Sequence, residues 1–139
     1  MATFLVASDG SAAAEKAVDF AANRARQEQA RLVIVNVSEP FCPVGVSELD
    51  VSVFDDAMKK ESAAILDAAI ARAKAAGVGA STVHEIGAPA EVIVAIAKRE
   101  GAGEIFVASH GRHGLARAVM GSIASRVVEW APCTVTVVK

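Results

Sequence analysis

Short, mostly apolar segments recur along this chain of 139 residues and alternate with longer stretches of helical periodicity. The clearest of these segments is 31–37, where Asn36 is the only polar residue after Arg31. A strand without a polar face is typical of a parallel sheet that helices cover on both sides. The chain is therefore predicted to fold as an α/β protein.

The alternation extends over the whole chain. The segments predicted as strands are 3–8, 31–37, 80–86, 104–108 and 133–138, and the predicted helices are 12–29, 54–76, 89–100 and 118–130. This pattern predicts a five-stranded parallel sheet in a three-layer sandwich, with helices on both faces. Right-handed crossovers favour the flavodoxin-type strand order 3-2-1-4-5. The length predicts a single domain over residues 1–139.

Two of the predicted strands have the character of sheet edges. Residues 80–86 alternate between polar and apolar side chains, and residues 133–138 end the chain with an exposed-edge pattern of threonines and valines. Residues 38–53 contain two prolines and a glycine, which predict a loop without regular structure. Such a long loop is either a functional cover or a plain connection, and the sequence favours neither.

Composition excludes several classes of function. The net charge is −2, and no basic run or interleaved aromatic set is present, so nucleic acid is not an expected partner. The longest apolar runs have strand length, and no leader segment is recognised, so no membrane association is expected. Cys42 and Cys133 lie far apart and form no metal or disulfide pattern, which fits a reducing cytoplasm.

The segment 105–122 carries the strongest functional signal. An apolar run ends at Ala108, a loop with Gly111 and Gly114 follows, and Gly121 and Ser122 stand at the front of the next helix. Glycines allow a backbone to approach a ligand closely. A helix start supplies unpaired N–H groups and the positive end of the helix dipole. The segment is therefore predicted to be a phosphate-binding loop.

The predicted topology places a second loop beside this one. In the order 3-2-1-4-5 the chain leaves the first and fourth strands toward opposite faces, and ligands bind at such a switch point. Asp9 follows the first strand, and Ala108 ends the fourth. Arg112 and Arg117 would add positive charge on the side of the glycine loop.

The standard signatures of phosphate and acyl chemistry are absent. The chain has no GxxxxGK[ST], no GxGxxG after the first strand and no GxSxG. His110 and His113 lie in a loop at a spacing that gives little support for a metal site. No residue has the marks of a strong general base beside the phosphates, so no catalytic residue and no metal ligand is assigned.

Several motifs together resemble the universal stress protein (UspA) family over essentially the whole chain. The first strand ends in Asp9-Gly-Ser, a Gly-Ala-Pro precedes the third helix, and Ser-His-Gly-Arg-x-Gly-Leu leads to Met-Gly-Ser at 120–122. In the ATP-binding branch of that family the motif reads Gly, two residues, Gly, nine residues, then Gly with Ser or Thr. Gly111 and Gly121 with Ser122 are in register, whereas Ala108 replaces the first glycine.

The resemblance implies a site for an adenine nucleotide. Residues after the first two strands would face adenine and ribose, with Asp9 near the ribose or a cation, and the glycine loop would hold the phosphates with Mg²⁺ or Mn²⁺. The implied site residues are Ala7, Ser8, Asp9, Val37, Val107, Ala108, Gly111, Arg112, Gly121, Ser122 and Ile123. Simpler roles stay open, because Asp9 or Ser122 could only cap a helix and the glycines could only form turns.

The function that the resemblance implies is that of a cytoplasmic, ATP-binding stress-response regulator with at most slow ATP hydrolysis. Its fold would be the adenine nucleotide alpha hydrolase-like sandwich, and it would form a homodimer through Thr134–Val138. The alternative is a dimeric interaction module of the same family that binds no nucleotide, which Ala108 favours. An adenylyl-transferring enzyme is disfavoured because the chain has no HxGH and no SGGxDS motif.

Overall fold

The computed structural model of the chain describes the backbone of residues 1–40, 48–111 and 120–139, and it describes the side chains of the same residues except 48–50. Strands and helices alternate in these segments. The described elements are β1 (Thr3–Ala7), α1 (Ala12–Glu28), β2 (Arg31–Ser38), α2 (Glu48–Ala75), β3 (Ala80–Ile86), α3 (Pro89–Glu100), β4 (Glu104–Ala108), α4 (Ser122–Trp130) and β5 (Thr134–Val138).

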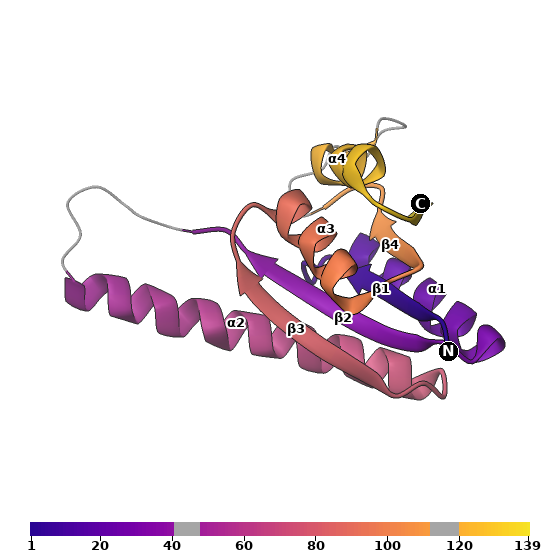
Figure 1. The fold of residues 1–139 in the computed structure, drawn as a ribbon. Coiled ribbons are helices and arrows are strands. Elements are labelled where there is room, and N and C mark those ends of the chain that lie inside the picture. The colour runs from indigo at the N-terminus through magenta and orange to yellow at the C-terminus, as the bar shows by residue number, and fades with distance from the viewer. Residues whose placement is uncertain (41–47, 112–119) are drawn as a thin grey trace.

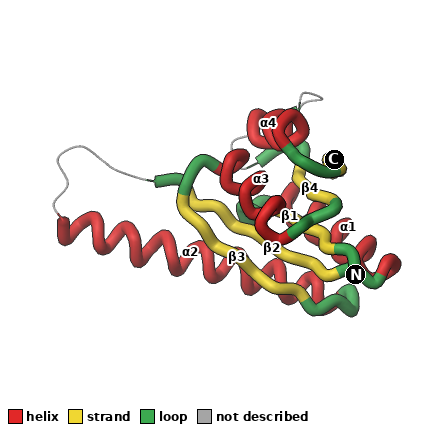
Figure 2. Tube along the Cα trace, viewed as in Figure 1, coloured by secondary structure: helices red, strands yellow, loops and turns green. Residues whose placement is uncertain are grey.

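The five strands of the described segments form one sheet in the order β3-β2-β1-β4-β5 (Figures 1 and 2). All strand pairs are parallel, and Phe4 of β1 lies between Leu32 of β2 and Glu104 of β4. The predicted order and the two predicted edge strands, β3 and β5, are confirmed. The carboxyl ends of β1 and β4 are neighbours, and this is the position where a ligand is expected.

Helices cover both faces of the sheet, as predicted. Alternate residues of β2 point to opposite faces, so Ile34 packs in one core with α1 and α2 while Val33 and Val35 pack in a second core with α3 and α4. Residues 32–35 are all fully buried. Residues 32–35 are all apolar because each of their side chains packs in one of these two cores.

Helix α2 is much longer than the strands that it covers. Its 28 residues span about 42 Å, whereas the 8 residues of β2 span about 26 Å. Figure 1 shows the amino-terminal half of α2 extending past the carboxyl ends of β2 and β3. None of the described helices, α2 included, has the length and apolar character that crossing a membrane requires.

Two predicted boundaries are wrong. Residues 48–53 were expected to lack regular structure but form the first turns of α2. The residues that break helices, Pro43 and Gly45, precede this segment, and the acidic residues that follow favour a helix start. The last helix was expected from residue 118, yet Met120 and Gly121 are not helical and α4 begins at Ser122.

A polar anchor joins the elements at the opposite end of the sheet from the glycine loop. Glu104, which is 8% exposed at the start of β4, accepts hydrogen bonds from Arg24 of α1 (3.2 Å) and from Thr136 of β5. The Arg24 guanidinium also lies over the rings of Phe4 and Phe106. Its hydrogen bond to Glu28 raises the pKa of Arg24 above its ordinary value.

Candidate functional site

A cavity of about 1160 Å³ opens at the carboxyl ends of β1, β2 and β4. The amino-terminal half of α2 forms one wall, and the first turns of α3 and α4 form the other. The predicted site residues on its walls are Ala7, Ser8, Asp9, Val37, Val107, Ala108, Gly111, Gly121, Ser122 and Ile123. Arg112, like Gly114, His113 and Arg117, lies outside the described residues.

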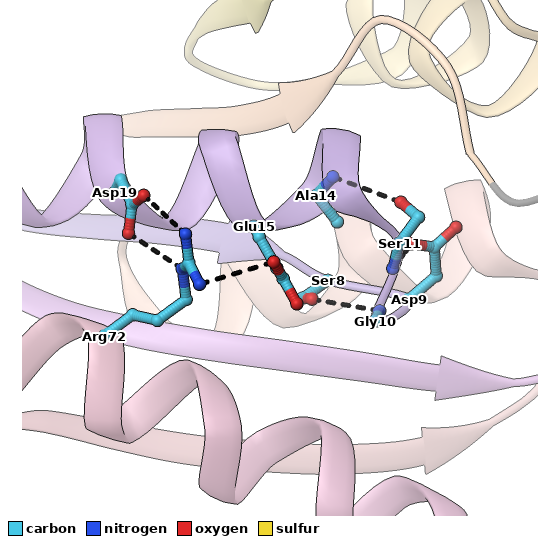
Figure 3. Close-up of polar contacts among 8 residues, drawn as sticks. All are labelled: Ser8, Asp9, Gly10, Ser11, Ala14, Glu15, Asp19 and Arg72. Carbon is cyan, nitrogen blue, oxygen red and sulfur yellow. Dashed lines mark hydrogen bonds and ion pairs between the residues drawn. The ribbon is translucent and has the colours of Figure 1, made fainter.

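The loop after β1 is a tight turn (Figure 3), and its Asp9 lines this cavity. One carboxylate oxygen of Asp9 accepts a hydrogen bond from the backbone N–H of Ser11 at 2.9 Å, and the backbone N–H of Gly10 donates to Ser8 Oγ at 3.2 Å. Ser11 Oγ in turn accepts from the backbone N–H of Ala14 at 3.1 Å. Ser11 is therefore the cap of α1, and Asp9 fixes the turn before it.

The loop after β4 approaches the loop after β1 at Gly111, and it folds back on itself at Gly121. A Cβ atom on Gly111 would lie 2.9 Å from Asp9 Oδ2, and one on Gly121 would lie 3.0 Å from the carbonyl oxygen of Ser109. The backbone N–H of Gly121 donates to that same oxygen at 2.6 Å. Both glycines thus have a steric reason in the fold: Gly111 leaves room for Asp9 of the neighbouring loop, and Gly121 leaves room for the backbone of Ser109 in its own loop.

The amino terminus of α4 opens on the cavity without a side-chain cap. Gly121 is the cap residue, with φ −64° and ψ 162°, and as a glycine it has no side chain that could accept a hydrogen bond from the first turn. Ser122 is the first residue inside the helix, so the simpler role as a cap does not apply to it. The first backbone N–H groups of α4 and the positive end of its dipole are therefore available to an anion.

The charged side chains around the cavity are mainly acidic. The described lining has one arginine, Arg126, and it has the carboxylates Asp9, Glu39, Asp55, Glu61 and Glu91. Among the described residues, no group of three or more His, Cys, Asp and Glu is placed to hold a metal ion. A multiply charged anion in this cavity would gain from a cation that it carries itself, because carboxylates nearby raise the energy of unscreened negative charge.

Sequence reasoning missed the contribution of α2. Phe54, Met58, Ser62 and Ile65 follow one another on one face of this helix and line the cavity. Helical spacing does place Met58 and Ile65 on one face, but such a face is predicted to pack in the hydrophobic core. The sequence does not show that α2 extends past the end of the sheet. Because it does, this face of α2 lines a cavity there instead of packing on strands.

One arginine of α2 ties this wall to α1. Arg72 Nε and Nη2 donate to the two carboxylate oxygens of Asp19 at 3.0 and 2.9 Å, and Nη1 lies 3.3 Å from Glu15 Oε2 (Figure 3). The hydrogen bond to Asp19 raises the pKa of Arg72 above its ordinary value. The contact adds to the apolar packing that holds α2 against α1.

The fold and the cavity define a doubly wound α/β protein with its candidate site at the switch point of the sheet. The chain belongs to the universal stress protein family, whose model matches residues 1–139. The resemblance found in the sequence motifs is thereby confirmed.

Individual relatives support this membership. Universal stress protein YxiE of Bacillus subtilis is 34% identical in an alignment of 143 positions, which covers 97% of this chain and 97% of that protein. Universal stress protein UspA from Lactobacillus plantarum superimposes with a TM-score of 0.88 at 25% identity, covering 99% and 97% of the two chains. A universal stress protein solved in complex with cAMP superimposes with a TM-score of 0.77 at 29% identity, again covering 99% and 97%.

Proposed function

We propose that this protein binds an adenine nucleotide in the cavity and acts as a cytoplasmic stress-response regulator whose partner contacts depend on occupancy. The observation that carries the proposal is the uncapped amino terminus of α4, which opens on the cavity at Gly121. A helix start with free N–H groups is a site for phosphate. The related protein solved with cAMP supports an adenine ring in the ligand.

In the proposed complex the phosphates lie against Gly111, Gly121, Ser122 and Ile123, with Arg112 adding positive charge. Asp9 faces the ribose, which Val107 and Ala108 flank. The backbone of Val37 contacts adenine, on the side of Ala7 and Ser8. All of the described members of this set line the same cavity, which is the geometric support for treating them as one site.

A divalent cation, Mg²⁺ or Mn²⁺, is proposed to enter on the phosphates of ATP. The acidic lining favours a ligand that brings its own positive charge. Magnesium keeps most of its water ligands and needs few protein ligands, so the lack of a metal-holding group among the described residues is compatible with this arrangement. The role proposed for the site is binding, with at most slow hydrolysis of ATP.

The direct test is to identify and then titrate the ligand. Mass spectrometry of the denatured, freshly purified protein should detect an adenine nucleotide, and isothermal titration of the emptied protein with Mg–ATP, AMP and cAMP should show saturable heat for at least one of them. Nothing released on denaturation, together with no heat at millimolar concentrations of all three, would reject the proposal.

The second candidate is a dimeric interaction module that binds no nucleotide. Ala108 favours it, because this cavity residue places a methyl group where the nucleotide-binding branch has glycine. Replacing Gly121 by valine should block the amino terminus of α4 and abolish nucleotide binding. Partner capture that is equally strong with wild type and Gly121→Val would favour the interaction module, and capture lost in the variant would favour the nucleotide-dependent regulator.

A further inference from the structure

Three of the four buried polar residues among the described part of the chain gather at one side of the cavity. Ser8 (6% exposed), Asn36 (5%) and Ser62 (2%) all line it, whereas Glu104 lies in the anchor at the other end of the sheet. Because strand side chains alternate, Ser8 and Asn36 point to the face that carries Phe4 and Ile34, which is the face that α1 and α2 cover. The three residues therefore meet beneath α2.

Ser8 and Asn36 have partners that hold them in place. Asn36 Nδ2 donates to the carbonyl oxygen of Ser8 at 2.9 Å, and the backbone N–H of Ser8 donates to the carbonyl oxygen of Val35 at 2.8 Å. Ser8 Oγ accepts from the backbone N–H of Gly10. The side chains of Ser8 and Asn36 thus form hydrogen bonds within the protein.

The hydroxyl of Ser62 is different. Its oxygen is buried and has no hydrogen-bond partner among the described residues. A serine on the buried face of a helix usually donates to the carbonyl four residues earlier, and no such bond is present here. Burying a hydroxyl without a partner is unfavourable, and alanine at this position would avoid that cost. The described part of the fold therefore gives no reason for the hydroxyl.

The proposed ligand supplies a reason. Phosphates at the start of α4 lie beside β4, and β2 is two strand spacings away, roughly 10 Å. A nucleotide held there extends its base along the strand ends toward β2 and α2. Phe54, Met58 and Ile65 of α2 provide apolar contact area for the faces of a purine. Ser62 lies on the same helix face, between Met58 and Ile65.

Resting on the proposed function, we propose that Ser62 determines base specificity by donating a hydrogen bond from its hydroxyl to a ring nitrogen of the bound purine. A purine ring nitrogen accepts one hydrogen bond, and a serine hydroxyl rotates to donate one. The bond satisfies a hydroxyl that has no partner among the residues that the structure describes. Through this bond, α2 recognises the base, whereas the phosphates are bound by other elements.

The test compares two probes on four proteins. AMP and ribose 5-phosphate are titrated against wild type, Ser62→Ala, Ser62→Cys and, as the control on the same helix, Ser52→Ala, whose side chain is exposed and does not line the cavity. Both Ser62 variants should bind AMP about tenfold more weakly than wild type. Neither should change the affinity for ribose 5-phosphate, and Ser52→Ala should match wild type with both probes.

The outcomes separate this inference from the proposed function. Wild type that binds none of AMP, Mg–ATP and cAMP overturns both. Two outcomes overturn only the role of Ser62, provided that wild type binds AMP. In the first, Ser62→Ala binds AMP as tightly as wild type does. In the second, Ser62→Ala loses the same factor of affinity for AMP and for ribose 5-phosphate. Thermal unfolding adds a second readout: the midpoint for Ser62→Ala should equal or exceed that of wild type, and a clear drop would show that the hydroxyl serves the fold.

Discussion

Gly111, in the loop after β4, lies close to Asp9 in the loop after β1, and it can do so because it has no side chain. We expect Gly111→Ala to push the Asp9 carboxylate aside, because the added Cβ would lie 2.9 Å from Asp9 Oδ2. The carboxylate end of an aspartate moves easily, so the midpoint of thermal unfolding should fall by no more than a few degrees. Binding of an adenine nucleotide, measured by isothermal titration, should weaken about tenfold.

The matched control for this prediction is Gly103→Ala. A Cβ at Gly103 would meet nothing within 4 Å, and the residue lies at the other end of β4. Affinity should therefore stay at the wild-type value. If both alanine variants bind like wild type, Asp9 takes no part in binding and the proposed position of the ribose is wrong.

Individual residues also show where sequence reasoning ends. The motif spacing predicted Gly111 and Gly121 as site residues, and the structure gives both a place on the cavity. Ser62 carries no such signal, because a serine in the middle of a helical pattern has nothing to distinguish it from a solvent-facing one. Its lack of a hydrogen-bond partner is a property of three-dimensional packing and appears only when α2 lies on the sheet.

At the scale of elements, the contact between α1 and α2 offers a defined prediction. Arg72→Met should lower the free energy of unfolding by at most about 1 kcal/mol, because the ion pair with Asp19 is more than one-third exposed on both sides and solvent screens it. Chemical denaturation of Arg72→Met, Asp19→Asn and the double variant should give a coupling energy within that range, and the coupling should shrink in high salt. A coupling energy of zero at low salt would show that packing alone positions α2.

Most elements could be predicted, since their periodicity is decided locally. The strand runs and the helix stripes fixed by Ala17, Ala21 and Ile96 depend on burial patterns that the sequence displays directly. The start of α2 could not be predicted, because two prolines and a glycine made the whole segment 38–53 resemble a loop. The acidic residues from Glu48 onward favour a helix start, but the sequence alone does not show that they outweigh the prolines and the glycine before them.

At the scale of the whole molecule, the acidic cavity predicts how a cation affects binding. Removal of divalent cations with EDTA should weaken binding of ATP at least tenfold, because its phosphates then meet five carboxylates and one arginine in the described lining without a counter-ion. Binding of cAMP, which has a single negative charge, should change less than twofold. Isothermal titration with and without magnesium checks both values, and equal losses for the two ligands would contradict the proposed electrostatics.

The free edge of the sheet at β5 predicts the oligomeric state. Thr134–Val138 pair with β4 on one side only in the described chain, and an apolar edge of this kind favours pairing with a second copy. Light scattering at micromolar concentration should give twice the mass of one chain. Val135→Lys, which places a charge on this half-buried strand, should shift the mass toward that of a single chain. A wild-type protein that is monomeric under these conditions would contradict the proposed homodimer.

The anchor formed by Arg24, Glu104 and Thr136 has a consequence for how such proteins diversify. It joins β4 and β5 to α1 away from the cavity, because none of its three residues lines the cavity. Substitutions of cavity residues therefore leave this anchor intact. Descendants of one ancestor are free to change what they recognise while inheriting the same framework, and an engineer who wants a new ligand preference should begin with the wall that α2 contributes.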